Sequence, residues 1–257
     1  MMNIDLSGRV AVVTGGAGDL GRTIVRQLAG CGADVAVHYH SRRQEADALV
    51  GELRAMGRRA VAVAADVGDA AAVQAMAARV RAELGDPNIV VANAVQQIHP
   101  WRPVLEETLA RYESQYRTSV VQNVLLAQAF VPAMRAGKWG RYIGINTVCT
   151  MECSSRQSAY VAGKGGMDRL LRVLAAEEGP HGITVNQVAP GWTMSDRYRK
   201  DGKDVEPDQA HVDSLPMRRR ATDEDIANAV CFLASDLARV ITGLYLPVSS
   251  GSVMPRV

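Results

Sequence analysis

The feature that most constrains the fold is a repeated alternation between short runs rich in β-branched residues and longer alanine-rich stretches. Continuous apolar runs, such as VAVV at residues 10–13, suit strands that are buried on both faces. Strand, helix and strand in succession predict a parallel sheet with right-handed crossovers and helices on both faces. The predicted strands are 10–14, 34–39, 60–64, 89–92, 142–146, 184–188 and 244–248. The predicted helices are 20–29, 43–56, 70–84, 112–134, 160–178 and 223–234.

Composition narrows the class of protein. Hydrophobic residues make up 47% and charged residues 22% of 257 residues, which excludes a disordered chain and a small disulfide scaffold. The 29 Lys and Arg nearly balance the 27 Asp and Glu, so we expect a small ligand and neither nucleic acid nor a membrane as partner. No linker divides the chain, and we expect one domain over residues 1–257.

Location and metal content follow from simple patterns. No apolar run reaches the roughly 18 residues of a membrane helix, and residues 1–9 lack the apolar region of a signal peptide, so a cytoplasmic protein is expected. The four cysteines form no CxxC pair and no Cys/His spacing typical of zinc. We therefore expect reduced thiols and no metal site.

A glycine-rich turn follows the first predicted strand, where residues 14–21 read TGGAGDLG. Gly16, Gly18 and Gly21 match the G-x-G-x-x-G fingerprint between a strand and a helix. Glycines let the backbone approach a pyrophosphate, and the N–H groups at the helix N-terminus bind its charge. The turn predicts a dinucleotide site; the alternative is a glycine-rich turn without a ligand.

The residues after the second predicted strand indicate which dinucleotide binds. Sites for NAD usually carry a carboxylate here for the ribose hydroxyls, but residues 38–43 read HYHSRR. Ser41 and Arg42 can instead hydrogen-bond a 2′-phosphate with charge assistance. We expect NADP(H), with NAD(H) as the alternative cofactor; the competing interpretation is solvated arginines at a helix start.

Tyr160 and Lys164 are four residues apart and share one face of a predicted helix. A phenol with an ordinary pKa of about 10 is a poor acid–base group at neutral pH. A neighbouring ammonium favours the phenolate and lowers that pKa. The pair is a candidate acid–base unit, although this spacing alone is also common on exposed helices.

Four separated motifs together resemble the short-chain dehydrogenase/reductase family over essentially the whole chain. They are the 14–21 turn, Asn93-Ala94, Tyr160 with Lys164, and NQVAPGWT at residues 186–193. The resemblance is greatest to NADPH-dependent ketoreductases, a branch that includes 3-oxoacyl carrier protein reductases and sugar-alcohol dehydrogenases. It implies an α/β, doubly wound Rossmann fold with a seven-stranded parallel sheet and an active site at the carboxyl ends of the strands.

The resemblance assigns catalytic roles to four positions. Tyr160 exchanges the substrate proton, and Lys164 binds the nicotinamide ribose and depresses the pKa of the tyrosine. Thr147, thirteen residues before Tyr160, stands where the family has a serine that binds the substrate oxygen. Ser119 stands where the family has an asparagine that anchors a relay water, with Asn123 one turn later.

The family pattern also implies cofactor contacts, and the chain departs from it at two of those places. Asp19 replaces the middle glycine of G-x-x-x-G-x-G, an unfavourable charge near a pyrophosphate unless the side chain caps the helix. Val95 stands where the family has glycine after Asn93-Ala94. Asp66-Val67 would meet the adenine, or Asp66 would cap a helix. The implied cofactor residues are Gly15, Ala17, Gly18, Asp19, Leu20, Gly21, Tyr39, Ser41, Arg42, Asp66, Val67, Asn93, Ala94, Tyr160, Lys164, Pro190, Gly191 and Thr193.

The predicted activity is reversible hydride transfer between NADP(H) and a ketone or secondary alcohol, either free or carrier-bound. The alternatives are a cofactor-binding regulator or scaffold without turnover, and an epimerase or dehydratase on the same fold. The irregular segment 191–217 is a candidate substrate lid. Residues expected either to line the substrate pocket or to pack in the core are Trp101, Cys149, Met151, Cys153 and Trp192.

By resemblance we expect a homotetramer or homodimer. Its contacts would be made by helices 112–134 and 160–178. Apolar positions on them that suit buried pairing are Val124, Leu125, Ala129, Leu170 and Val173, several of which packing on the sheet explains equally well.

Overall fold

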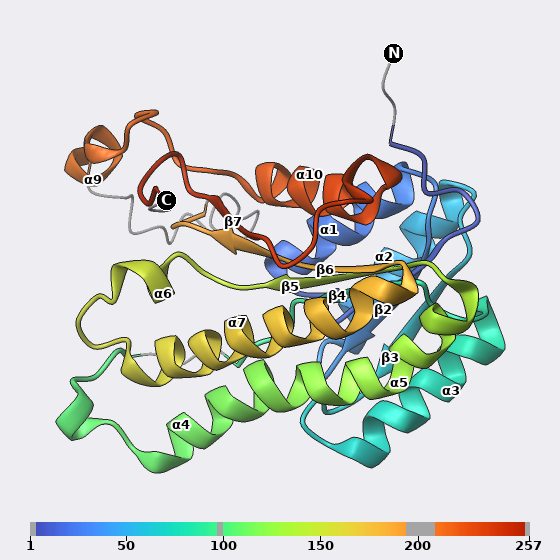
Figure 1. The fold of residues 1–257 in the computed structure, drawn as a ribbon, viewed down its shortest axis with the longest axis horizontal. Coiled ribbons are helices and arrows are strands. Elements are labelled where there is room, and N and C mark those ends of the chain that lie inside the picture. Colours follow the sequence, from blue (N-terminus) through green and yellow to red (C-terminus); the bar gives the residue numbers. More distant parts are fainter. Residues whose placement is uncertain (1–3, 97–99, 194–208, 255–257) are drawn as a thin grey trace.

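The computed structural model describes residues 4–96, 100–193 and 209–254. In these residues one parallel sheet has the strand order β3-β2-β1-β4-β5-β6-β7 (Figure 1). The strand order reverses between β1 and β4, as in a doubly wound Rossmann sheet, and confirms the predicted fold class. The strands are β1 (Val10–Val13), β2 (Asp34–Tyr39), β3 (Ala60–Ala64), β4 (Ile89–Ala92), β5 (Gly140–Ile145), β6 (Ile183–Pro190) and β7 (Tyr245–Val248).

Helices cover both faces of the sheet. Figure 1 shows α1 and α10 on one face and α3, α5 and α7 on the other. The helices are α1 (Asp19–Gly30), α2 (Arg43–Ala55), α3 (Ala70–Leu84), α4 (Leu109–Tyr116), α5 (Gln122–Gly137), α6 (Cys149–Glu152), α7 (Ser158–Glu178), α9 (Gln209–Ser214) and α10 (Asp223–Ala234). Short 3-10 helices cover Val104–Glu106, Gly179–His181 and Asp236–Ala238, and a π-helix covers Arg117–Val121.

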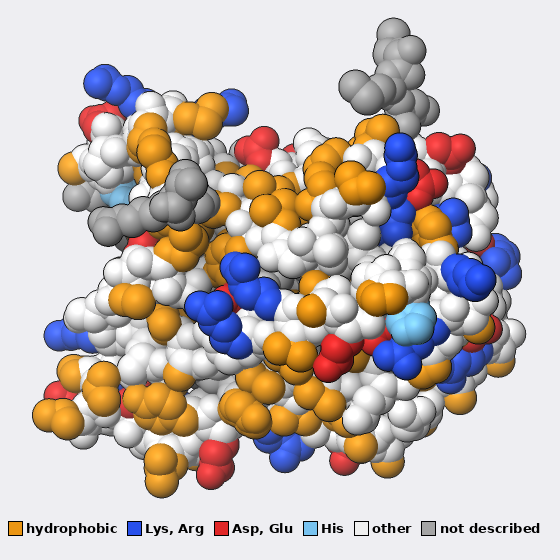
Figure 2. Space-filling view, in the orientation of Figure 1, with side chains coloured by type: hydrophobic (Ala, Val, Ile, Leu, Met, Phe, Trp, Pro, Cys, Tyr) orange, Lys and Arg blue, Asp and Glu red, His pale blue; other side chains and the backbone are white. Residues whose placement is uncertain are grey.

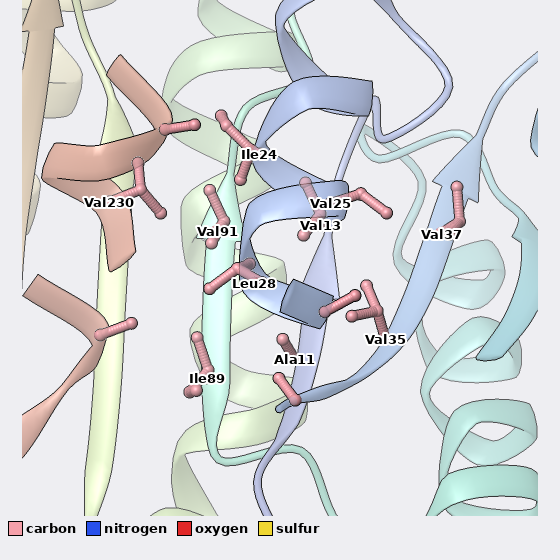
Figure 3. Packing of buried hydrophobic residues seen from close by; sticks show 14 of the residues in the cluster. Ala11, Val13, Ile24, Val25, Leu28, Val35, Val37, Ile89, Val91 and Val230 are labelled. Atoms are coloured by element: carbon pink, nitrogen blue, oxygen red, sulfur yellow. The ribbon is translucent and has the colours of Figure 1, made fainter. Parts of the chain in front are cut away.

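Alternate residues of the central strands belong to two hydrophobic clusters, one on each face of the sheet. Ala11 and Val13 of β1 pack with Leu28 of α1 and Val230 of α10 (Figure 3). Val12 belongs instead to the cluster on the opposite face. All four residues of β1 are buried, as the apolar run predicted. Burying each such side chain contributes about 1.5–3 kcal/mol, so the central strands form a stable frame for the loops at their ends.

The structure corrects several predicted boundaries. Strand β5 begins at Gly140 rather than 142, and β6 extends over Ile183–Pro190 rather than 184–188. Gly140 pairs with Ile183 of β6, and its lack of a side chain lets the strand approach Met134, whose Cβ would lie 2.9 Å from an added Cβ. Helix α7 begins two residues before Tyr160, at Ser158. The predicted helix 112–134 extends from Leu109 to Gly137 and contains a π-helical turn in its middle.

Part of the predicted lid, residues 194–208, lies outside the described residues. Residues 209–214 of that segment form α9. No helix in the described ranges is long and apolar enough to cross a membrane. Within those ranges no group of three or more His, Cys, Asp or Glu side chains is placed to hold a metal ion, and the four cysteines are free thiols.

Candidate active site

A cavity of about 940 Å³ opens at the carboxyl ends of the strands. It brings together the glycine turn, the end of β2, Tyr160 and Lys164. Ser119 and Thr193 are the two predicted site residues that do not line it. The lining residues are Gly15, Ala17, Gly18, Asp19, Leu20, Gly21, His38, Tyr39, His40, Ser41, Arg42, Ala65, Asp66, Val67, Asn93, Ala94, Val95, Gln96, Thr118, Ile145, Asn146, Thr147, Tyr160, Lys164, Pro190 and Gly191.

The glycine turn has the family's spacing rather than that of the simple fingerprint. Gly15 has a φ of +62°, which favours glycine, and a Cβ at Gly21 would lie 2.1 Å from the carbonyl oxygen of Gly15. Helix α1 begins directly after Gly18, and no side chain caps it. The N–H groups of its first turn are therefore available to a phosphate, so the turn fits a dinucleotide.

Asp19 is not a helix cap, which corrects one of the two expectations for it. Its carboxylate lies 3.1 Å from the guanidinium of Arg22 and 3.7 Å from that of Arg42. Both arginines offset the negative charge that replaces the family's glycine. Arg42 remains on the cavity wall beside Ser41, in the position expected for a 2′-phosphate contact.

His38 is a further residue of the site that was not among the predicted ones, and its ring contacts the glycine turn. The Gly15 N–H donates to its Nδ1 at 2.9 Å, and its Nε2–H lies 3.0 Å from the carbonyl oxygen of Ala65. Burial lowers the pKa of His38 to about 4, so the ring is neutral at pH 7. A histidine among the apolar residues of a strand is unusual, but the local sequence does not show that it contacts the glycine turn, 23 positions away.

Asn93 and Thr14 connect the ends of β4 and β1. The Asn93 Nδ2 donates to the carbonyl oxygen of Thr14 at 2.9 Å, and the Thr14 hydroxyl donates to Gln122 Oε1 at 2.7 Å. The same hydroxyl oxygen accepts the Ala94 N–H at 3.0 Å. The next residue, Val95, lines the cavity with a partly exposed side chain, so the branched group takes up cavity space.

Two acids in the loop after β3, Asp66 and Asp69, make different contacts. Asp66 accepts the N–H of Gly68 at 2.8 Å and lines the cavity beside Val67. The cap of α3 is Asp69, whose carboxylate accepts the Ala72 N–H at 2.7 Å. The capping role considered for Asp66 is therefore wrong.

Tyr160 and Lys164 lie in the same cavity, but the expected influence of the lysine on the tyrosine is not found. Burial first, and then the Cys149 thiol, raise the pKa of Tyr160 above its ordinary value, while a hydrogen bond with Thr147 opposes them. Lys164 Nζ instead donates to the carbonyl oxygen of Ile145 at 2.6 Å, and burial lowers its pKa to about 8. At neutral pH the tyrosine is therefore a protonated phenol, and most of the lysine is cationic.

Thr147 is held rigidly at the end of β5. Its N–H donates to Asn146 Oδ1 at 2.9 Å, and its Oγ1 accepts the N–H of Cys149 at 3.2 Å. Thr147 and Tyr160 line the same cavity, and the Thr147 hydroxyl partly opposes the burial that raises the pKa of Tyr160. This pair can bind one carbonyl oxygen of a substrate.

The tryptophans and cysteines near the site have different positions. The Trp101 ring lies 5.7 Å from the Tyr160 ring, although Trp101 itself does not line the cavity. Trp192 packs on His211 of α9, with ring centroids 5.2 Å apart. Cys149 is half-buried near Tyr160, whereas Met151 and Cys153 are exposed.

Ser119 lies inside the π-helical turn, a local distortion that often marks functional sites. It is fully buried, and its Oγ has no hydrogen-bond partner among the described residues. Asn123 Nδ2 donates to the Ser119 carbonyl oxygen at 2.6 Å, and the Tyr142 hydroxyl donates to Asn123 Oδ1 at 2.9 Å. The Asn123 side chain thus binds the backbone carbonyl oxygen of Ser119, the residue expected to anchor the relay water.

Thr193 turns back on its own loop. Its hydroxyl donates to the carbonyl oxygen of Gly191 at 3.0 Å, and the Arg220 guanidinium donates to the Thr193 carbonyl oxygen at 3.2 Å. Pro190 and Gly191, by contrast, lie on the cavity wall. The cofactor contact expected for Thr193 stays a prediction.

Comparison with known proteins gives consistent findings. A family model described as enoyl-(acyl carrier protein) reductase matches residues 15–252. L-Rhamnose 1-dehydrogenase (NAD(P)(+)) of a Sphingomonas species is 30% identical over 247 residues, which cover 96% of each chain. A 3-oxoacyl-[acyl-carrier-protein] reductase of Staphylococcus aureus is 35% identical over 249 residues, covering 95% of this chain and 98% of the relative. A blue fluorescent protein from a metagenomic library, solved in complex with NADPH, superposes with a TM-score of 0.88 at 36% identity, covering 97% of this chain and 100% of that chain.

Proposed function

The chain belongs to the short-chain dehydrogenase/reductase family and is an NAD(P)-dependent oxidoreductase of CH–OH and carbonyl groups; from this premise we propose that it is an NADP(H)-preferring ketoreductase. The observation that carries the proposal is one cavity lined by both the glycine turn and the Thr147, Tyr160 and Lys164 side chains. When bound, NADP(H) supplies the hydride.

The protonation states favour the reductive direction. Burial raises the pKa of Tyr160, so the phenol carries the proton that a reduced carbonyl oxygen must receive. The Thr147 hydroxyl holds the same oxygen and stabilises the charge that develops on it. Lys164 offers three N–H groups, one of which binds the Ile145 carbonyl oxygen, leaving donors for the ribose hydroxyls of the cofactor.

Cofactor preference rests on the residues after β2. Ser41 and Arg42 line the cavity, and residues 38–43 contain no carboxylate that would repel a 2′-phosphate. Asp19 lies nearby but already pairs with Arg22 and Arg42. A 2′-phosphate adds two charges for Arg42 to bind, which favours NADPH over NADH.

The test follows NADPH oxidation by absorbance with a panel of ketones. The relatives suggest its first members, a 3-oxoacyl thioester for reduction and L-rhamnose for oxidation with NADP⁺. Tyr160→Phe should lower kcat by about 10²–10⁴-fold, because the proton donor is lost, and should leave the Kd of NADPH within about twofold. Tight NADPH binding with no turnover of any substrate would favour the regulator alternative.

Subunit assembly and domain extent stay proposals. We propose that residues 1–257 form one domain and that it pairs through α5 and α7. Figure 2 shows hydrophobic side chains gathered over α4 and between α7 and α5, and Val173 on α7 is 55% exposed. Ala129 is buried in the core and is unavailable for pairing. Light scattering after gel filtration should show a dimer or tetramer.

A further inference from the structure

Tyr245, at the start of the edge strand β7, reaches across to the turn that carries Thr147. Its hydroxyl donates to the carbonyl oxygen of Thr147 at 2.5 Å. The Thr150 hydroxyl lies 2.5 Å from the Tyr245 hydroxyl and 3.0 Å from the same carbonyl oxygen. Two side-chain hydroxyls therefore converge on one peptide group beside the catalytic centre.

The backbone holds the N–H side of this peptide, where the Val148 N–H donates to the carbonyl oxygen of Pro190 at 3.1 Å, but it holds the carbonyl side only weakly. The N–H of Thr150 lies 3.4 Å from the Thr147 carbonyl oxygen, near the limit of a hydrogen bond. Helix α6, which follows, has only four residues and cannot stiffen the turn by itself. Among the described residues, the hydroxyls of Tyr245 and Thr150 are thus the close hydrogen-bond donors to the Thr147 carbonyl oxygen.

Tyr245 does not line the cavity, so it does not touch the substrate directly. It lies in β7, which pairs with β6 through Gln187, and the buried sheet therefore fixes its backbone. Burial raises the pKa of the Tyr245 phenol, so it stays protonated and donates at any working pH. These properties suit a group that holds another residue in place.

We propose that Tyr245 is a positioning residue for the reaction: by holding the Thr147 peptide, it aims the Thr147 hydroxyl at the substrate oxygen beside Tyr160. The proposal rests on the ketoreductase function proposed above. Displacing a catalytic group by about 1 Å can cost up to about 100-fold in rate, so a loosened Thr147 should slow the chemical step and spare cofactor binding.

The experiment compares wild type with Tyr245→Phe, which removes the hydroxyl and keeps the ring. We expect kcat to fall about tenfold while the Kd of NADPH stays within about twofold. NADPH deuterated at the transferred position should give a larger isotope effect on kcat in the variant, because hydride transfer becomes more rate-limiting. The exposed Tyr116 of α4 provides a matched control, and Tyr116→Phe should behave as wild type.

A second variant, Thr150→Val, removes the other hydroxyl of the same cluster. Both hydroxyls act on one carbonyl group. In the double variant that combines Tyr245→Phe and Thr150→Val, we therefore expect kcat to fall by a smaller factor than the product of the two single-variant factors. Hydrogen exchange of the amides at residues 147–150 should speed up in Tyr245→Phe and not in Tyr116→Phe. This reports on the turn even in a variant too slow to assay.

The outcomes separate the two proposals. A wild type inactive on every substrate overturns the ketoreductase function and, with it, the catalytic part of this inference. An active wild type whose kcat and isotope effect are unchanged in Tyr245→Phe overturns the role of Tyr245 alone. A variant that loses NADPH affinity as much as kcat has a structural defect, which also overturns the positioning role.

Discussion

At the scale of single residues, burial controls the ionisable groups around the cavity. Tyr160 has a raised pKa, whereas Lys164 and His38 have lowered ones, and burial is the largest cause in each case. A motif of four-residue spacing identifies the tyrosine and lysine but does not show that the ammonium faces the Ile145 carbonyl group. That orientation depends on the end of β5, which lies far from the motif in the sequence.

His38 gives a test of pH-dependent stability. Its pKa is about 4 in the folded chain against an ordinary value of about 6.5, so the unfolded chain takes up a proton first as the pH falls. The stability that the neutral ring contributes is complete above pH 6.5 and is lost between about 6.5 and 4. From pH 7.5 to 4.5 this loss amounts to about 2–3 kcal/mol.

Urea unfolding of wild type and His38→Asn at the two pH values measures this loss. Carboxylates titrate alike in both proteins, so the difference between the two pH dependences isolates the histidine. We expect the wild type to lose about 2–3 kcal/mol more than the variant on acidification. Identical losses would show that His38 is not held neutral by the fold.

At the scale of elements, uninterrupted apolar runs predict the limits of strands well. Where a glycine or a charged residue interrupts the run, the predicted limits are wrong. Strands β2, β3 and β4 begin and end as predicted because a polar residue or a glycine lies within two positions of each end. Strand β5 was predicted too short because Gly140-Arg141 resembles a loop, although Arg141 is buried and pairs with Asp236. The π-helical turn at Arg117–Val121 leaves the helical pattern of its sequence intact, so tertiary packing alone reveals it.

The candidate site was predictable to the extent that its residues follow the strands or belong to local motifs. Thr147, Tyr160, Lys164 and the glycine turn are of this kind, and the cavity unites them. His38 and Tyr245 act through contacts between separate elements, and the ion pair of Asp19 with Arg42 depends on how α2 approaches the turn. Such contacts have no local pattern, so the sequence alone does not indicate them.

Helix α1 packs so closely on the glycine turn that a single methyl group added at Gly21 should disturb the turn. A Cβ at Gly21 would lie 2.1 Å from the Gly15 oxygen and 2.9 Å from its carbon, so helix and turn must separate. We expect Gly21→Ala to weaken NADPH binding by at least about tenfold, because the phosphate-binding N–H groups move. Fluorescence titration with NADPH measures the change.

Gly30, at the other end of α1, provides the matched control. A Cβ there meets nothing within 4 Å, so Gly30→Ala should retain wild-type affinity and stabilise the helix by roughly 0.5–1 kcal/mol. If Gly21→Ala bound NADPH as tightly as Gly30→Ala, the close approach of α1 to the turn would not matter for binding.

At the scale of the whole molecule, the site joins segments from most of the chain around the carboxyl edge of the sheet. The two hydrophobic clusters hold the strands and helices in place, and the loops at this edge surround an open cavity. A cofactor that bridges these loops binds the folded chain and not the unfolded one. Binding must therefore raise the unfolding temperature, by an amount that grows with the logarithm of the ratio of free cofactor to its Kd.

This linkage measures cofactor preference without a substrate. At a concentration 100 times its Kd, NADPH should stabilise the fold by about 2.7 kcal/mol, which corresponds to roughly 5–10 °C in a chain of this length. NADH at the same concentration should give a smaller shift, because Arg42 then lacks a 2′-phosphate to bind. Arg42→Ala should reduce the NADPH shift toward the NADH value and leave the NADH shift nearly unchanged.

The neighbouring Arg43 controls for the general loss of a positive charge. Its side chain is 78% exposed, pairs with Asp47 at 3.5 Å and does not line the cavity, so Arg43→Ala should keep the wild-type difference between the two cofactors. Equal losses of both shifts in Arg42→Ala would mean that this arginine binds a group common to NADPH and NADH. The preference for NADPH would then require a different residue, because Arg42 is the guanidinium that lines the described cavity wall next to Ser41.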